Sequence, residues 1–382
     1  MITKSAKAIV VFYVLRMLDR LEMVKVGVGV RKLRVYILIW RLHSTYIYLV
    51  PVLVFANTPA AYQVIVLLEM LSKIVEKLIA NRLSVQACKL GLIHPSQYGL
   101  LPGVSTIHAA VSLTHEVVIA QKLKLKAASL FLDIKGGFDN IRPAQLSGLL
   151  RAKGVSPYIV SWMRSFLSRR TCRLKFQGCP GNFKCVAVGT PQGSPISPWL
   201  FVLYVASLHR GAGMQNTFSF VDDFALTTIC LSHRRNIQIL QVRFKALWCR
   251  AKKLGLAFSI PKSDFIHLHT PKDHSPRCPT PIHLDSEVFL PKEEVRWLGY
   301  RFTPNLASIA HFNCRLTLAF AIIKKLSPPG SGLTTLQTCC LVYSLLLPVV
   351  LYGADLLVPN GAMAQRLEVC WHRALRSATN CF

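Results

Sequence analysis

The chain has 382 residues, 52% of them hydrophobic, and carries 46 Lys and Arg against 17 Asp and Glu, a formal net charge of +29. This hydrophobic content supplies the core of one large enzyme or of two domains. The excess of positive charge makes the surface attractive to polyanions, of which nucleic acid is the commonest. The 12 cysteines contain no CxxC pair, which excludes a zinc ribbon and gives no readable disulfide framework. We interpret them as mostly buried thiols in a reducing intracellular compartment, the nucleus or the cytoplasm.

Residues 1–58 are apolar and basic and carry no readable chemistry. Basic residues such as Arg31 and Arg41 interrupt every apolar window before it reaches the roughly 20 uncharged residues of a spanning helix. We therefore interpret this segment as an extension of unclear structure, with a membrane anchor as the alternative. No membrane is expected as a partner.

From residue 62 onward, periodic apolar residues predict helices and strands in turn. The expected helices cover residues 67–83, 106–125, 142–151, 157–167, 197–209 and 234–254, and most of 307–378. The expected strands cover residues 127–134, 172–176, 183–188, 265–268, 288–290 and 295–302, with a short hairpin at 218–227. This order predicts an α+β fold in which helices back a sheet.

The predicted hairpin at residues 218–227 has two adjacent carboxylates, Asp222 and Asp223, between apolar β-formers. Side chains alternate faces along a strand, so only a turn or bulge lets neighbouring aspartates converge. Two like charges held close require a cation. The alternative is a solvated Asp-Asp turn. A second acidic strand end, at Asp133, and a Gly/Pro loop at residues 189–195 make the cation site the better interpretation.

Five motifs in this order resemble the reverse transcriptase domain of a non-LTR (LINE-like) retrotransposon. They are residues 132–139 (LDIKGGFD), 190–198 (TPQGSPISP), 220–223 (FVDD), 254–263 (LGLAFSIPKS) and 295–300 (VRWLGY). Residues 72–83 and 97–105 are similar to upstream finger segments of that family, and residues 352–355 to its thumb. The resemblance extends over roughly residues 60–380.

The resemblance implies the right-hand polymerase architecture, an α+β fold whose antiparallel palm sheet is backed by helices. Fingers are expected at residues 59–127, the palm with its primer-grip hairpin at 128–303 and a helical thumb at 304–382, after the extension at 1–58. The implied activity is that of an RNA-directed DNA polymerase from a retrotransposon. Its partners would be an RNA template, a DNA primer and deoxynucleoside triphosphates, and its oligomeric state is left open.

The catalytic role that the resemblance assigns falls on Asp133, Asp222 and Asp223. Chain extension builds charge on the attacking 3′-hydroxyl and on the leaving oxygen, and two Mg²⁺ ions held by carboxylates stabilise both. The carbonyl of Ile134 is the expected additional metal ligand.

Further roles follow from the same resemblance. The expected nucleotide-binding residues are Phe138, which would act as a gate against the 2′-hydroxyl, Gln192, Gly193 and Lys262. The expected primer grip comprises Trp297, Leu298 and Gly299. Each has a structural alternative. Phe138 could be an ordinary core phenylalanine, Gln192 and Gly193 a plain Gly/Pro turn, Lys262 a solvated surface lysine, and the primer grip a hydrophobic hairpin that packs on the palm.

Two positions depart from the family pattern. Gln63 stands where the family usually has an arginine that contacts the triphosphate, and Val104 replaces the arginine of a Gly-Arg-Ser segment. A catalytically silent nucleic-acid-binding relative is therefore the alternative function. No endonuclease or RNase H pattern is readable, so we expect this chain alone to copy a template without cutting a target site.

Overall fold

The computed structural model describes residues 45–51, 62–67, 70–176, 179–211, 214–269, 281–284, 287–326, 334–357 and 360–379. Apart from strand β1 (Thr45–Pro51), the extension expected at residues 1–58 lies outside this range. Contacts divide the chain into two compact units. Unit 1 comprises Met1–Ile93 and Gly136–Val205, and unit 2 comprises His94–Lys135 and Ala206–Phe382. The predicted boundaries of fingers, palm and thumb remain a prediction.

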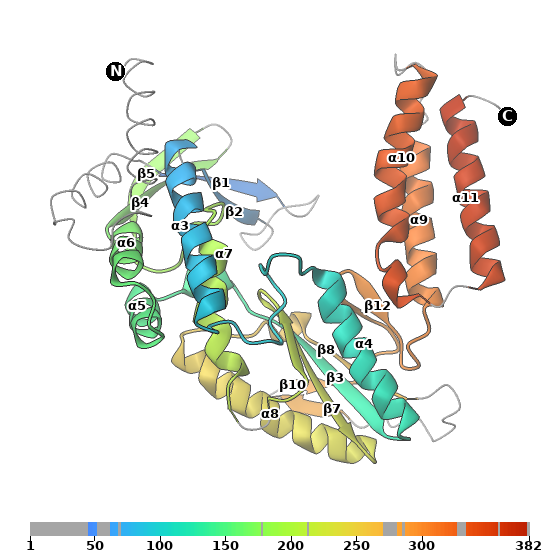
Figure 1. Ribbon diagram of the computed structural model, residues 1–382, viewed down its shortest axis with the longest axis horizontal. Helices are drawn as coiled ribbons and strands as arrows, with labels where there is room; N and C mark the ends of the chain where they lie inside the picture. The colour runs from blue at the N-terminus through green and yellow to red at the C-terminus, as the bar shows by residue number, and fades with distance from the viewer. Residues whose placement is uncertain are drawn as a thin grey trace. The chain divides into compact units, whose positions relative to one another are not determined.

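Unit 1 contains a four-stranded sheet in the order β2-β1-β4-β5. Strand β1 runs antiparallel to β2 (Tyr62–Leu67) and parallel to β4 (Arg170–Phe176), which forms the predicted hairpin with β5 (Cys179–Val186). The sheet therefore joins two distant stretches of the chain (Figure 1).

The helices of unit 1 are α3 (Met70–Lys89), α5 (Pro143–Ala152), α6 (Pro157–Leu167) and α7 (Ser197–Val205), with a short 3-10 helix, η2 (Gly137–Asn140). Both α5 and α6 begin with proline, whose fixed φ and missing N–H suit a first helical turn. Helix α7 contacts α3, α5 and η2, and its side chains from Leu200 to Val205 are all buried. It is the apolar centre of this unit.

Unit 2 contains an antiparallel sheet in the order β6-β7-β3-β8. Its strands are β6 (Thr217–Phe220), β7 (Asp223–Cys230), β3 (Lys126–Asp133) and β8 (Asp264–Leu268). Strand β3 lies between β7 and β8 and is buried along most of its length, which explains why it reads as a continuous apolar run. The predicted antiparallel sheet backed by helices is confirmed.

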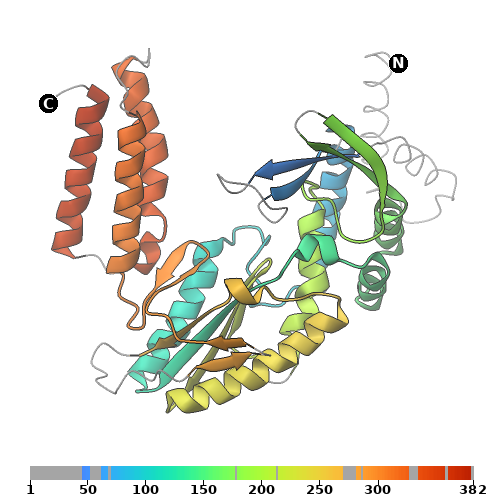
Figure 2. The same cartoon turned by 180° about the vertical axis from the view of Figure 1, so that it is seen from behind.

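Two helices, α4 (Thr106–Lys122) and α8 (His233–Lys253), lie on either side of this sheet (Figures 1 and 2). Because strand side chains alternate, Ala127 and Phe131 of β3 pack with α4, and the strand hydroxyl of Thr228 turns to α8, where it donates to the Asn236 carbonyl. One face of the sheet thus belongs to α4 and the other to α8.

Two small hairpins extend unit 2. They are β9 (Ile282–Leu284) with β10 (Glu287–Phe289), and β11 (Val295–Trp297) with β12 (Tyr300–Phe302). The sequence predicted the second as a hairpin and only one strand of the first. Trp297 and Phe302 pack into the same hydrophobic cluster as α4 and β3.

Helices α9 (Ile309–Leu326), α10 (Thr335–Leu351) and α11 (Gly361–Thr379) stand side by side around a core that includes Phe312, Val342 and Ala374. A short 3-10 helix, η5 (Ala354–Leu356), follows α10. Within the described part of the chain, Thr335–Leu356 is long and apolar enough to cross a membrane by length and composition alone. A single segment of this kind is weak evidence, because a core helix of a bundle meets the same criteria.

Candidate active site

The three predicted catalytic carboxylates lie at one end of the sheet in unit 2. Asp133 ends β3, Asp223 begins β7, and these two residues face each other across the antiparallel ladder. Asp222 lies in the two-residue turn between β6 and β7, where its carbonyl accepts from the Ile134 N–H at 3.2 Å. The structure therefore brings Asp133 together with Asp222 and Asp223, which follow it about ninety residues later in the sequence.

The turn that carries Asp222 has an unusual backbone. Val221 has a φ of +58°, in the left-handed region that two-residue hairpin turns use and that Gly or Asn normally occupies. A β-branched residue there is a conformational outlier. The strain persists because the surrounding structure holds the turn in place.

Gln97 and Gly99 are the residues that hold this turn. The Gln97 amide oxygen accepts from the N–H of Val221 and of Gly99, both at 3.3 Å, and its amide nitrogen donates to the Val221 carbonyl at 3.4 Å. Gln97 is fully buried. A Cβ on Gly99 would lie 2.6 Å from Val221 Cγ2 and 2.8 Å from its nitrogen, so glycine is needed for the close approach.

Gln97 was predicted only as part of an upstream finger-like segment, and its role in holding the turn was not predicted. The backbone strengthens the same contact, because Ser219 donates to Ser96 and Tyr98 donates to Ser219, both at 2.9 Å. The only sequence signal was a glycine two residues after a glutamine in a turn-rich loop.

Burial and mutual repulsion shape the electrostatics of the carboxylates. Burial, with the neighbouring charges of Asp222 and Asp133, raises the pKa of Asp223 to about 7. Burial and Asp133 also raise the pKa of Asp222. Lys262 opposes both shifts, with its Nζ 3.4 Å from Asp133 Oδ2. That lysine is 73% exposed, so a single solvated ammonium leaves most of the repulsion uncompensated.

Lys262 reaches the carboxylates through local backbone contacts. It ends a short 3-10 helix, η4 (Ile260–Lys262), and the residue before this helix, Ser259, donates to the Asp133 carbonyl at 2.8 Å. Lys135 donates to the Ala257 carbonyl at the same distance. The structure thus brings the predicted Lys262 together with the predicted acids.

The predicted nucleotide-binding residues of unit 1 also meet one another. Phe138, in η2, stacks on Phe201 with ring centroids 4.9 Å apart, and its carbonyl accepts from the Thr190 N–H at 2.7 Å. Thr190 begins the loop with Gln192, half-buried, and Gly193, exposed at a φ of +111°. Phe138 therefore packs as a half-buried aromatic side chain, and its backbone contacts the start of the loop that carries Gln192 and Gly193.

The same loop is held by a buried acid that sequence analysis did not single out. The Ser194 hydroxyl donates to the Glu76 carboxylate of α3, and Glu76 is completely buried. Burial raises the Glu76 pKa to about 7, although the Ser194 hydrogen bond and Lys73 oppose the shift.

The predicted primer-grip residues form the tip of the β11–β12 hairpin. Trp297 is buried against Phe131, with ring centroids 5.5 Å apart. Its packing is that of the hydrophobic hairpin named above as the alternative to a primer grip. Leu298 and Gly299 form the turn with φ values of +50° and +82°, as a two-residue turn of this kind requires. The Tyr352 hydroxyl donates to the Leu298 carbonyl, and Arg315 donates to the Gly299 carbonyl at 2.7 Å.

Comparison with known proteins decides the family. Residues 56–302 match the family model described as reverse transcriptase (RNA-dependent DNA polymerase). The chain belongs to this reverse transcriptase family. The match confirms the predicted α+β right-hand polymerase fold class.

Curated relatives of this reverse transcriptase domain come from mobile elements. The chain is 25% identical to the probable RNA-directed DNA polymerase from transposon BS and 26% identical to that from transposon X-element, both of Drosophila melanogaster. Each match covers 85% of this chain but only 37% and 36% of the relative. The RNA-directed DNA polymerase from mobile element jockey of Drosophila funebris is 31% identical over 44% of this chain and 19% of its own length. The predicted resemblance to retrotransposon enzymes is confirmed.

Among solved structures, telomerase from Candida tropicalis in complex with a TWJ fragment of telomeric RNA is similar at a TM-score of 0.49 and 12% identity. The match covers 88% of this chain and 58% of that chain.

The carboxylates of the reverse transcriptase domain fit a hard divalent cation in their chemistry. Carboxylate oxygens are the ligands that Mg²⁺ prefers, and the raised pKa values mark charge repulsion that a cation relieves. Among the described residues, however, no group of three or more His, Cys, Asp or Glu side chains is arranged to hold a metal ion as it stands. The carboxylates must turn toward one another to bind one.

The two departures from the family pattern have different surroundings. Gln63 pairs with Val50 in the β1–β2 ladder, and its side chain lies outside the described part of the structure. Val104 is half-buried in the turn before α4, where its N–H donates to the Leu101 carbonyl at 3.1 Å.

Proposed function

We propose that this chain is an RNA-directed DNA polymerase that extends a primer 3′-hydroxyl by two-metal nucleotidyl transfer, as part of a retrotransposon. The observation that carries the proposal is the cluster of Asp133, Asp222 and Asp223 at one sheet end in a chain of +29 net charge. Few acids are available, and three of them lie half-buried together, where their mutual repulsion is energetically unfavourable. The matched relatives cover more than this chain, so the activity of the whole protein is part of the proposal.

The chain's own groups have distinct tasks in this mechanism. Asp133, Asp222 and Asp223, with the Ile134 carbonyl, would hold two Mg²⁺ ions. When bound, these ions stabilise charge on the attacking and leaving oxygens. Lys262 exchanges its contact with Asp133 for the pyrophosphate leaving group, to which it can donate a proton.

The remaining predicted residues orient the substrates. Phe138 limits the space at the 2′ position of the nucleotide, and the Gln192-Gly193 backbone approaches the base pair. Trp297, Leu298 and Gly299 position the primer end. The proposed partners are an RNA template, a DNA primer and deoxynucleoside triphosphates, with fingers at residues 59–127, palm at 128–303 and thumb at 304–382. The proposed location is a reducing compartment, the nucleus or the cytoplasm.

The second candidate function is a catalytically silent relative that binds nucleic acid. Gln63 and Val104 favour it, because a missing guanidinium on the triphosphate would weaken transition-state binding by a few kcal/mol. Both candidates bind nucleic acid, so only a catalytic assay separates them.

The test is primer extension on an RNA template with labelled deoxynucleotides and Mg²⁺, with the full chain and its Asp222→Asn variant. We expect extension by the wild-type chain and at least a thousandfold loss in the variant, which removes a metal ligand and keeps the side-chain size. If a folded wild-type chain binds the primer–template and does not extend it, the silent relative becomes the better account.

A further inference from the structure

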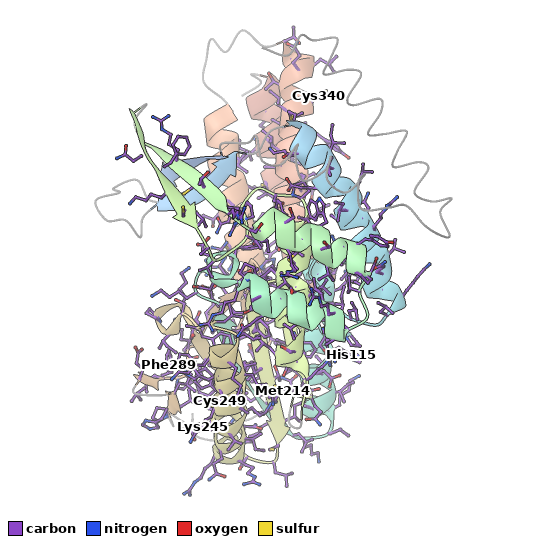
Figure 3. The ribbon with its side chains drawn as sticks, turned by 90° about the vertical axis from the view of Figure 1, so that its left-hand side faces the viewer. His115, Met214, Lys245, Cys249, Phe289 and Cys340 are labelled. Atoms are coloured by element: carbon purple, nitrogen blue, oxygen red, sulfur yellow. The ribbon has the colours of Figure 1, made fainter. Side chains whose placement is uncertain are left out.

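Helix α8 presents a basic stripe to solvent. This 21-residue helix contains no Asp or Glu. Its Arg234, Lys245 and Lys252 are exposed, and at 100° per residue they lie within about 20° of one another around the helix axis. At 1.5 Å per residue the stripe places these cations about 16 Å and about 10 Å apart. Figure 3 shows Lys245 on this helix.

A cavity of about 480 Å³ opens between α8, the end of strand β7 and the turn at Gln215 and Asn216 that precedes β6. Its lining is mostly apolar, with Ile229, Ile239 and Val242, and it also carries hydrogen-bonding groups from Asn216, Thr227, Thr228, Arg235, Gln238 and Arg243. Arg and amide donors of this kind are those that bind phosphate oxygens in nucleic-acid complexes. The stripe and the cavity share α8, where Arg235 of the lining is the chain neighbour of Arg234, and we call the two together the α8 groove.

The most telling member of the α8 groove is Arg243. It is 93% buried, with 7% exposure, and it donates to the carbonyls of Thr227 and Gln215 and, at 2.9 Å, to the hydroxyl of Thr217. These partners are neutral, and Arg243 Nε has no hydrogen-bond partner in the described structure. A buried guanidinium with only neutral partners retains its charge, because burial lowers its pKa only to about 10. Such a charge attracts an anion to the adjacent cavity.

The α8 groove lies at the opposite end of β7 from the catalytic carboxylates. Asp133 shares its side of β3 with Phe131, which packs with α4, and Asp223 faces Asp133 across the ladder. Helix α8 covers the other side, and the cavity is lined by the last residues of β7, far along the strand from Asp223. A ligand in this groove is therefore distinct from the nucleotide of the polymerase site.

We propose that the α8 groove binds the phosphodiester backbone of a nucleic-acid strand outside the polymerase active site. A single small anion can fill the cavity but cannot reach cations spaced over more than 25 Å of helix, as residues 234–252 are. A polyanion with regularly spaced charges does both. The choice of nucleic acid among polyanions rests on the proposed function. In that function, the groove would hold a part of the RNA template that lies outside the polymerase active site.

The first test compares two triple variants of the full chain, each losing three positive charges. One carries Arg234→Gln, Lys245→Gln and Lys252→Gln. The matched control carries Lys89→Gln, Arg151→Gln and Arg164→Gln, exposed cations on the helices of unit 1. Binding of a fluorescently labelled RNA hairpin is measured by anisotropy over a series of salt concentrations, and a DNA hairpin of the same sequence shows whether the sugar matters.

We expect the α8 variant to bind at least tenfold more weakly and to lose about 2–3 from the slope of log affinity against log salt, since each phosphate contact contributes about 0.9. The control variant should keep the wild-type slope. Equal losses in both variants would overturn the proposal and leave α8 as a solvated basic face. The assay needs no catalysis, so its outcome is independent of whether the chain polymerises.

A footprint provides the second test. Cys230 lines the cavity, whereas Cys340 is exposed on α10. We expect the RNA hairpin to slow alkylation of Cys230 by N-ethylmaleimide in the wild-type chain at least fivefold, with no protection in the α8 variant, while Cys340 serves as the reference. If inorganic phosphate protects Cys230 as fully as RNA does, the cavity is a site for a single small anion and the proposed strand binding is wrong. If RNA does not slow the alkylation of Cys230, the cavity does not bind RNA and the proposal is wrong.

Discussion

At the scale of single residues, the position of Asp222 depends on a strained valine and a buried amide. A left-handed backbone costs a β-branched residue on the order of 1–2 kcal/mol, and Val221 adopts one. Gln97 offsets this by bonding both the N–H and the carbonyl of Val221. The amide thereby fixes the backbone that carries Asp222, so Gln97 is a positioning residue.

We expect Gln97→Met, which keeps the volume and removes the hydrogen bonds, to lower kcat of primer extension about tenfold to a hundredfold. Loss of two or three buried hydrogen bonds corresponds to about 1–3 kcal/mol, and the freed turn would misplace a metal ligand. KM for the deoxynucleotide should change little, because the Gln97 side chain is completely buried. Steady-state kinetics with varied nucleotide measures both constants.

Gln86→Met is the matched control. Gln86 on α3 accepts a hydrogen bond from Ser156 N–H at 3.1 Å, and both residues belong to unit 1, whereas the catalytic turn belongs to unit 2. The Gln86→Met variant should have a lower melting temperature and an unchanged kcat of primer extension. If both variants lose the same activity, Gln97 acts through general stability alone.

At the scale of elements, α3 and the loop before α7 are joined by the buried pair of Glu76 and Ser194. Glu76 has no exposed surface, and burial is the main cause of its raised pKa. Ser194 lies one residue after Gly193, and its hydroxyl also accepts from the Ile196 N–H at 3.3 Å. A protonation change at Glu76 therefore acts directly on the loop proposed to approach the nucleotide.

The sign of the pH effect follows from this shift. Glu76 titrates near 4.5 when unfolded and near 7 when folded, so between these values the native state holds a proton that the unfolded state has lost. The free energy of unfolding should therefore fall as pH rises from about 4.5 to 7, by up to a few kcal/mol. Urea unfolding of wild type and Glu76→Gln at pH 5 and pH 8 measures this, and the variant should lose less stability. An identical pH dependence in both proteins would contradict the buried, protonated acid.

How far the elements were predictable depends on how local their signals are. Pro143 and Pro157 begin helices, the apolar run before Asp133 is a buried strand, and the acidic turn after Phe220 is a hairpin, all as predicted. Gln97 and Glu76 could not be predicted because their partners lie 124 and 118 residues away. A glutamine or glutamate in a turn or helix carries no sign of what it will contact after folding. The β9–β10 hairpin was incomplete in the prediction because its strands have only three residues each.

At the scale of the whole molecule, the net charge of +29 sets how the chain meets nucleic acid. Cations that neutralise phosphates release condensed counterions, so affinity falls steeply with salt. This binding term carries little sequence information. It acts in both candidate functions.

We expect primer–template affinity to fall by about a thousandfold or more between 50 and 200 mM salt, if six or more phosphates are contacted. Anisotropy titrations with the Asp222→Asn variant should give the same slope as wild type, because the carboxylate is outside the phosphate contacts. A slope near zero would show that the positive charge is not used for this binding.

The central place of β3 in its sheet also governs how the protein is made. Of the strands of this sheet, β3 is translated first. Its neighbour β7 ends at Cys230, and its other neighbour β8 ends at Leu268, well over a hundred residues after β3. At roughly 5–20 residues per second, the ribosome needs on the order of ten seconds to supply both partners. During this interval the apolar stretch Leu130, Phe131 and Leu132 has two open strand edges. Synthesis of the soluble protein should therefore depend on chaperones that shield this strand until translation passes β8.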